Sequence, residues 1–244
     1  MGARLGAPAR HLATVGSTMT EAAAWAAQGA PHGAVVTAEH QTAGRGRHGR
    51  TWAAAPGEGL LFTVVLRPSL EPSRLGLVAL AAGLGVAEAV AAWGVGAALK
   101  WPNDVRAGGR KLAGVLAEAR HGPGGPVVLV GVGLNVRQSG FADGLAATSV
   151  RMETGEDAEP RALLGPVLAA VGRRLDAARE APGALVAAVE GRMEGLGQPV
   201  TVRDPATGAE VARGRALGLA PDGALRLATD AGQRAVHAGE VTLS

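Results

Sequence analysis

Cysteine, isoleucine and tyrosine are absent from this sequence of 244 residues, and lysine and asparagine occur only twice each. Without cysteine, the chain has no disulfide, no thiolate nucleophile and no cysteine-ligated metal site. No run of about 18 uninterrupted apolar residues is present, so we expect no membrane span. The N-terminal stretch lacks the apolar segment of a secretory signal. These absences fit a cytoplasmic chain.

The chain also lacks a large excess of positive or negative charge. The 24 Lys and Arg residues barely outnumber the 21 Asp and Glu residues, so a net charge of +3 does not require a nucleic-acid partner. Nearly all the basic residues are arginine, which suggests that lysine persists only where arginine cannot replace it. The two lysines and two asparagines all lie in one stretch, which points to a single functional region: Lys100, Asn103, Lys111 and Asn135.

The hydrophobic patterns predict an α+β arrangement for most of the chain. Thr18 and Glu21 have the spacing of a capping box, and Gly29 is a stop signal, so a helix is expected between Thr18 and Gly29. The stretch 40–58 is rich in glycine and arginine and predicts a long loop. The other expected strands are 33–38, 60–66, 98–101, 111–119 and 126–135, and the other expected helices are 73–92, 160–179 and 182–195.

The hydrophobic pattern of the sequence changes near Gly195–Gly197, from helical spacing to short alternating segments. From Gln198 onward, the segments PVTVRD, EVARGRALGLA, ALRLAT and RAVHAGEVTL alternate in the manner of strands. They are separated by DPATG, PDG and DAG, which are typical turn sequences. We therefore expect two domains, 1–195 and 196–244, and the second is predicted to be a small β-barrel.

Glycine alternates with arginine in the segment GRGRHGRT at 44–51. The segment matches a dinucleotide fingerprint and nearly matches a P-loop, but both motifs must open directly into a helix. Here a loop containing proline follows instead, so neither interpretation fits. Arg45, Arg47 and Arg50 still suit a small anionic ligand, because arginine binds phosphate oxygens in pairs and glycine admits backbone N–H groups. A nucleic-acid contact and an exposed loop without a ligand remain alternatives.

Four motifs follow one another in a fixed order: AEHQTAGRGRHGRTW at 38–52, KWPND at 100–104, GRKLAGVL at 109–116 and GVGLN at 131–135. In this order they resemble the biotin protein ligase family, from about Gly16 to Asn135 and more weakly to the C-terminus. The resemblance is to the ligase-only class without the N-terminal DNA-binding domain. It implies an α+β fold, like that of class II synthetases, with a mixed central β-sheet, helices on one side and a small C-terminal SH3-like β-barrel.

The resemblance also implies a reaction, ATP-dependent and AMP-forming, in two steps. Biotin's carboxylate attacks the α-phosphorus of ATP, with Mg²⁺ on the phosphates, to give biotinyl-5′-AMP. A lysine of a biotin carboxyl carrier protein, a subunit of acetyl-CoA carboxylase or a related carboxylase, then takes the biotinyl group. A cytoplasmic monomer or weak homodimer is implied, with no DNA and no membrane partner.

Site residues are carried over from the family's motifs position by position, and no metal ligands are assigned. The catalytic set is Lys111, Arg45, Arg47 and Asp104. The biotin-binding set is Ser17, Thr18, Met19, Gln41, Arg45, Gly46, Arg47, Lys111 and Gly114. The ATP-binding set is Arg50, Trp52, Asn103, Lys111 and Asn135.

Several of these positions have a second interpretation. Ser17 and Thr18 could simply cap a helix, and Met19 stands where the family has asparagine, which removes one polar partner. Trp52 offers a flat face for adenine but could equally be core packing. Asp104 could orient the carrier lysine or help to hold Mg²⁺.

Two other functions stay open at this point. A lipoate or octanoate ligase or transferase shares the catalytic fold. A nucleic-acid-binding module could use the arginine loop and the small barrel, although four Trp, two Phe and no Tyr provide few surfaces for base stacking.

Overall fold

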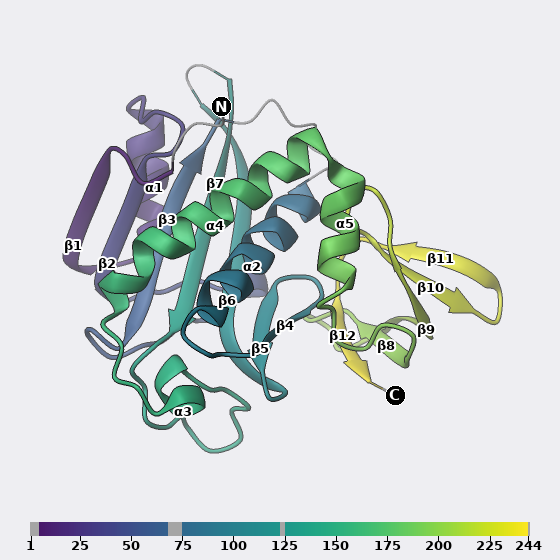
Figure 1. The fold of residues 1–244 in the computed structure, drawn as a ribbon. Coiled ribbons are helices and arrows are strands. Elements are labelled where there is room, and N and C mark those ends of the chain that lie inside the picture. The colour runs from purple at the N-terminus through teal and green to yellow at the C-terminus, as the bar shows by residue number, and fades with distance from the viewer. Residues whose placement is uncertain (1–4, 68–74, 123–124, 244) are drawn as a thin grey trace.

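The computed structural model describes residues 5–67, 75–122 and 125–243 (Figure 1). Positions 73–74 of one expected helix, and part of the expected turn at 121–125, lie outside these ranges. The first domain contains the following elements in chain order: β1 (Ala9–Val15), α1 (Thr18–Ala27), β2 (Val35–Gln41), a 3-10 turn (Arg47–Gly49), β3 (Gly59–Leu66), α2 (Leu75–Ala91), β4 (Ala97–Lys100), β5 (Asp104–Ala107), β6 (Arg110–Gly122), β7 (Gly125–Asn135), α3 (Val150–Thr154), α4 (Pro160–Glu180) and α5 (Pro182–Glu190).

Seven strands form the central sheet in the order β1-β2-β3-β7-β6-β5-β4. Strand β1 runs parallel to β2, and every other neighbouring pair is antiparallel. The sheet is therefore mixed, as the α+β prediction expected. Strands β3, β6 and β7 lie at its centre and carry the apolar side chains that fill the core.

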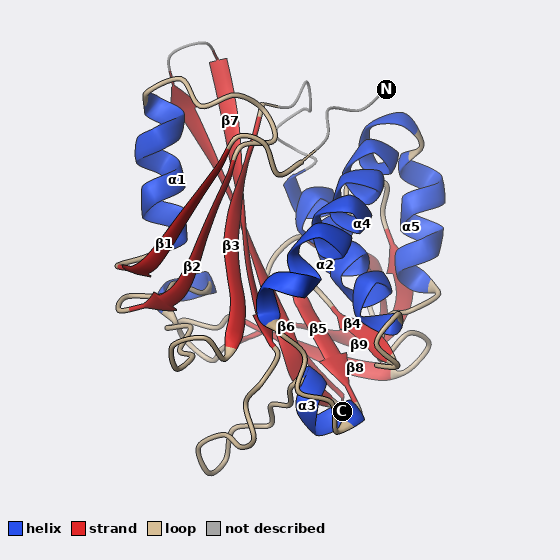
Figure 2. Ribbon diagram, turned by 60° about the vertical axis from the view of Figure 1, so that its left-hand side comes forward, coloured by secondary structure: helices blue, strands red, loops and turns tan. Residues whose placement is uncertain are grey.

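Both faces of this sheet are covered by helices (Figure 2). Helices α2 and α4 pack on one face with the larger core, which includes Val35 and Phe62. Helix α1 packs on the other face, where Met19, Val36 and Leu129 form a second core. The family resemblance implied helices on one side of the sheet only. Helix α1 lies on the other side because β2, β3 and β7 are apolar on both faces and need cover on each.

Helix α1 begins one residue earlier than the capping-box prediction implied. Ser17 is the N-cap, and its side chain accepts a hydrogen bond from Met19 N. Thr18 is the first helical residue, and its hydroxyl is free of the capping role. The cap prediction is corrected to Ser17, and Thr18 becomes available for other contacts.

The second domain is a five-stranded antiparallel sheet in the order β11-β10-β9-β8-β12. No pairing of β11 with β12 closes it into a barrel within the described residues. The expected strand RAVHAGEVTL divides into two at His237–Gly239. The predicted boundary after residue 195 falls between the end of α5 and the start of β8. The strands are β8 (Pro199–Arg203), β9 (Glu210–Leu219), β10 (Leu225–Thr229), β11 (Gly232–Val236) and β12 (Glu240–Leu243).

This second sheet sits against the β4 end of the central sheet (Figure 1). Leu99 exchanges backbone hydrogen bonds with the segment that follows α5, and the buried Trp101 donates from Nε1 to Gly223 O at 3.0 Å. In the described part of the chain, no helix has the length and apolar character to cross a bilayer.

Candidate active site

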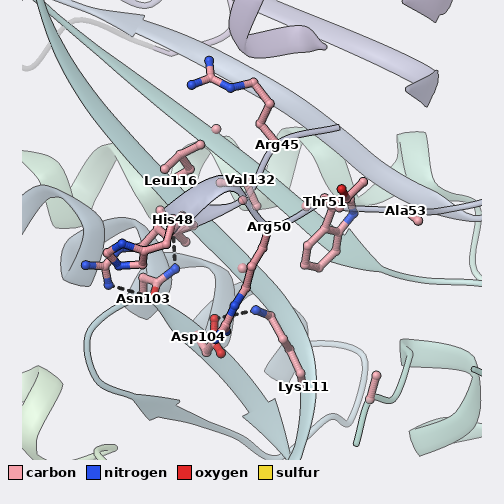
Figure 3. A pocket seen from close by; sticks show the side chains of 18 of the residues that line it. Arg45, His48, Arg50, Thr51, Ala53, Asn103, Asp104, Lys111, Leu116 and Val132 are labelled. Carbon is pink, nitrogen blue, oxygen red and sulfur yellow. Dashed lines mark hydrogen bonds and ion pairs between the residues drawn. The ribbon is translucent and has the colours of Figure 1, made fainter. Parts of the chain in front are cut away.

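A cavity of about 480 Å³ opens where α1, β2, the 42–58 loop and strands β5 to β7 meet (Figure 3). All fourteen residues assigned to the site from the sequence line this one cavity. They come from segments as far apart as residues 17 and 135, so only the fold brings them together. Their individual roles stay predictions.

Neutral polar groups occupy the α1 end of the cavity. Gln41 Oε1 accepts hydrogen bonds from Thr18 N at 2.7 Å and from Thr18 Oγ1 at 3.0 Å. Behind them, Thr63 Oγ1 on β3 donates to Thr18 Oγ1 at 2.9 Å. Ser17 and Thr18 are 3 % exposed, so this end is largely shielded from bulk water before any ligand enters.

Glycines on β7 leave room for two large side chains. A Cβ on Gly131 would lie 2.8 Å from Met19 Sδ, and a Cβ on Gly133 would lie 2.3 Å from Trp52 Cε2. Real Cβ atoms do not approach so closely, so Met19 and the Trp52 indole can lie on the sheet only because these positions are glycine. Trp52 Nε1 is buried and has no hydrogen-bond partner among the described residues.

The cationic end of the cavity is built around Lys111. Its Nζ lies 2.7 Å from Asp104 Oδ1 and 5.7 Å from the centroid of the Trp52 ring. Strands β5 and β6 are neighbours, and their register places Lys111 opposite Arg106, two residues along β5 from Asp104. The Lys111 side chain is about one-third exposed, and it lines the cavity, where it can meet an anion.

Each arginine of the 44–51 loop has a protein partner in a different part of the molecule. Arg45 pairs with Glu118 on β6 at 2.6 Å, and Arg50 makes two hydrogen bonds to Glu240 on β12. Arg47 donates to the neutral amide oxygen of Asn103 at 3.2 Å. Figure 3 shows the guanidinium of Arg45 directed away from the Asp104–Lys111 pair.

Burial and pairing change the acidity of these groups. Burial lowers the pKa of Arg47, and the negative charges of Asp104 and Glu240 act against that effect. The hydrogen bond from Arg50 lowers the pKa of Glu240, and the same bond raises the pKa of Arg50. A half-buried guanidinium that contacts only an amide gains more from an anionic ligand than one already paired with a carboxylate.

The two asparagines hold the walls of the cavity together. Asn103 Nδ2 donates to Val115 O at 2.8 Å, which ties the KWPND turn to β6. Asn135 is 4 % exposed, and its Nδ2 donates to Thr148 O at 3.0 Å. Whatever each contributes to ATP binding, each amide also fixes a segment of backbone beside Lys111.

Among the residues at or behind this cavity that were not assigned from the sequence, Thr63, Glu118 and Glu240 bond through their side chains to residues that were assigned. Thr63 did carry a signal, because it is the one polar residue in the apolar strand LLFTVVL. The two glutamates carried none. A motif does not show which distant carboxylate will pair with its arginines, and Glu240 lies 190 residues from Arg50.

The described residues offer no resident metal site. No group of three or more His, Cys, Asp or Glu side chains gathers there, and the cavity's carboxylates, Asp104 and Glu240, are both paired with cations. Mg²⁺ is commonly held by substrate phosphates and water with few protein ligands. A magnesium ion that enters such a cavity on a phosphate-bearing ligand therefore needs few ligands from the protein.

Comparison with protein families gives two matches that together cover most of the chain. The Biotin/lipoate A/B protein ligase family matches residues 12–136, and the Biotin protein ligase C terminal domain matches residues 195–244. The biotin--[acetyl-CoA-carboxylase] ligase of Paracoccus denitrificans is 38% identical over 245 residues, covering 94% of this chain and 98% of that protein. The ligase of the same name from Mycobacterium tuberculosis is 48% identical over 134 residues, so the match spans 49% of that relative.

Solved structures agree with this result. The biotin protein ligase from Aquifex aeolicus in complex with biotin and ATP has a TM-score of 0.85 at 29% identity, covering 98% of this chain and 99% of that one. The biotin protein ligase from Leishmania major in complex with biotinyl-5-AMP has a TM-score of 0.68 and covers 96% of this chain and all of that one. At 23% identity, the second comparison concerns the fold alone.

Proposed function

This chain belongs to the biotin/lipoate A/B protein ligase family, and from that membership and its cavity we propose that it attaches biotin to a lysine of a carrier protein. The reaction uses ATP and passes through biotinyl-5′-AMP. The carrier is a biotin carboxyl carrier protein, a subunit of acetyl-CoA carboxylase or a related carboxylase. We further propose a cytoplasmic enzyme, monomeric or weakly dimeric, that uses no DNA partner.

One observation carries the proposal: a single cavity has a buried neutral polar end and a cationic end. Thr18 and Gln41 form the first, and Lys111 and Arg47 form the second. Biotin has the matching shape, with a neutral cyclic urea at one end of an aliphatic chain and a carboxylate at the other. Met19, Leu116 and Val132 line the cavity and offer apolar contact to the chain.

The cationic end suits the first step of the reaction. A carboxylate oxygen forms a bond to the α-phosphorus, the bond from that phosphorus to the bridging oxygen breaks, and pyrophosphate leaves. Two anions must meet for this to happen, so fixed cations lower the barrier by cancelling their repulsion. Lys111 and Arg47 supply these charges, and Asp104 holds Lys111 in place through their 2.7 Å contact.

In the second step, the neutral amine of the carrier lysine attacks the acyl carbon of biotinyl-5′-AMP. The C–O bond to phosphate breaks, AMP leaves with its negative charge, and the ammonium formed on the new amide nitrogen loses its proton. The adenylate hydrolyses in water, so shielding matters. The 44–51 loop contacts both domains through Arg45 and Arg50, and its residues line the cavity, so we propose that it shields the intermediate.

Biotin-dependent exchange of labelled pyrophosphate into ATP tests the proposal. Exchange should require biotin and Mg²⁺, and label from biotin should then appear on one lysine of a carrier domain. Exchange with lipoate or octanoate, and none with biotin, would assign the chain to the lipoate branch of the family. The NH₂ group of Gln41 argues against that branch, because the Gln41 oxygen is already engaged by Thr18 and an alkyl chain gives the NH₂ group no hydrogen-bond partner.

A further inference from the structure

The hydrogen-bond chain at the polar end of the cavity has a direction that chemistry alone fixes. The backbone N–H of Thr18 can only donate, so the Gln41 atom 2.7 Å from it must be the amide oxygen. That oxygen can only accept, so the Thr18 hydroxyl must donate its single proton to it. Thr63 must therefore donate to Thr18, since the Thr18 proton is already used.

This direction decides what the cavity presents to a ligand. A hydroxyl oxygen has two lone pairs, and on Thr18 one of them takes the Thr63 proton. The other lone pair remains to accept an N–H from a ligand. Because its oxygen is engaged, Gln41 presents its NH₂ as a donor, and Ser17 Oγ accepts from Met19 N and so keeps its own proton to give.

From this geometry we propose that Thr63 is a positioning residue for biotin recognition, an inference that rests on the proposed function. Thr63 is fully buried on β3, and it holds the Thr18 hydroxyl from behind so that the free lone pair faces the cavity. One acceptor beside two donors matches a cyclic urea, whose N–H groups flank its carbonyl. Thr63 reaches the ligand only through Thr18.

The test compares three variants by calorimetric binding of biotin and by biotin-dependent pyrophosphate exchange. Thr63→Val keeps the shape and removes the hydroxyl, whereas Thr63→Ser keeps the hydroxyl. Thr37→Val is the matched control. Thr37 is a buried threonine on β2 whose hydroxyl pairs with His11 at 2.8 Å, and it lies on the same sheet face as Val35, away from α1.

We expect Thr63→Val to raise the Kd and KM for biotin about fivefold, which corresponds to one net hydrogen bond, and to leave the KM for ATP unchanged. Thr63→Ser should return both biotin constants to near wild type, and Thr37→Val should change neither. If Thr63→Val lowers the unfolding temperature more than Thr37→Val does, the same binding and exchange constants are measured on Thr63→Ala, which also lacks the hydroxyl.

Two results would overturn the proposal. One is a Thr63→Val enzyme whose biotin constants stay within twofold of wild type. The other is a parallel rise in the KM for biotin and for ATP that Thr63→Ser does not reverse, which would make the residue merely structural. A wild-type enzyme without biotin-dependent exchange would instead refute the proposed function, and that result appears before any variant is compared.

Discussion

Lys111 is the residue on which most of the proposed chemistry depends. Its ammonium lies at the cationic end of the cavity beside Asp104 and near the Trp52 ring. A compact charge on a long side chain can follow a group that moves during reaction, which a planar guanidinium does less readily. Its pairing with Asp104 keeps it aimed into the cavity before a ligand arrives.

We expect Lys111→Ala to slow adenylate formation by at least roughly a hundredfold, because the lost charge acts where carboxylate and phosphate meet. The KM for ATP should change much less. Single-turnover formation of biotinyl-5′-AMP measures the first quantity. Arg213→Ala, which removes an exposed charge paired with Glu210 in the second sheet, is the control and should match wild type. Near-normal turnover in Lys111→Ala would remove this residue from the mechanism.

Gly133 is a second residue with a direct effect on the cavity, because it determines where the Trp52 ring can lie. An alanine Cβ there would lie 2.3 Å from the indole, so Gly133→Ala must displace the ring into the cavity. We expect this to raise the KM for ATP several-fold and to destabilise the fold by about 1–3 kcal/mol. Gly96→Ala is the control, because its Cβ would meet nothing within 4 Å. Equal effects of the two substitutions would show that Trp52 does not depend on the glycine.

Single residues also show how far the sequence could predict the site. The four motifs, together with the match at 17–19, supplied fourteen residues that all line the cavity, because short motifs keep catalytic residue types together. They did not predict that Arg45 pairs with Glu118 or that Arg50 pairs with Glu240. Such pairs depend on tertiary packing between segments that are distant in the chain.

Among the elements, the strands that sequence patterns missed are short or exposed. Strand β5 has only four residues, too few for an alternating pattern to stand out, and β1 is an edge strand whose residues are mostly exposed. The five-residue helix α3 was missed for the same reason as β5. The long apolar strands β3 and β7 were predicted almost to their ends, because burial on both faces leaves an uninterrupted apolar run.

Strand β12 contacts the arginine loop through the Arg50–Glu240 pair, and this contact should depend on pH. Arg50 holds the pKa of Glu240 below its ordinary value of about 4.3. A carboxyl whose pKa is lowered in the folded state stabilises the protein above that ordinary value, and the effect is lost as pH falls through the lower folded pKa. Both side chains are substantially exposed, so the contribution is at most about 1 kcal/mol.

We therefore expect Glu240→Gln to be less stable than wild type at pH 7 and equal to it in acid below that folded pKa. Denaturant unfolding at a series of pH values measures the difference. In an Arg50→Ala background, the difference caused by Glu240→Gln at pH 7 should shrink, because only the weaker attraction of Lys100 and Lys111 then acts on the Glu240 carboxylate. A constant gap between Glu240→Gln and wild type across the series would mean that this ion pair is not its source.

At the scale of the whole molecule, the KWPND segment joins the two sheets as well as lining the cavity. Trp101 is 3 % exposed and donates from Nε1 to Gly223 O in the turn before β10. The neighbouring Leu99 pairs with the backbone that follows α5. A segment that supplies Asn103 and Asp104 to the cavity is thus held in position by the second sheet, and we expect that sheet to influence ATP binding through this segment.

Trp101→Phe tests this coupling. The substitution removes the Nε1 donor and leaves the Gly223 carbonyl buried without its partner, so we expect the free energy of unfolding to fall by about 1–3 kcal/mol. The KM for ATP should rise as well, because Asn103 and Asp104 follow Trp101 closely in the chain. Trp93→Phe makes the same chemical change at a partly buried tryptophan that packs on the core after α2. The opposite result is that both variants lose the same free energy of unfolding and keep the wild-type KM for ATP. The contact with the second sheet would then have no effect on the cavity, and the first domain alone would determine the position of the KWPND segment.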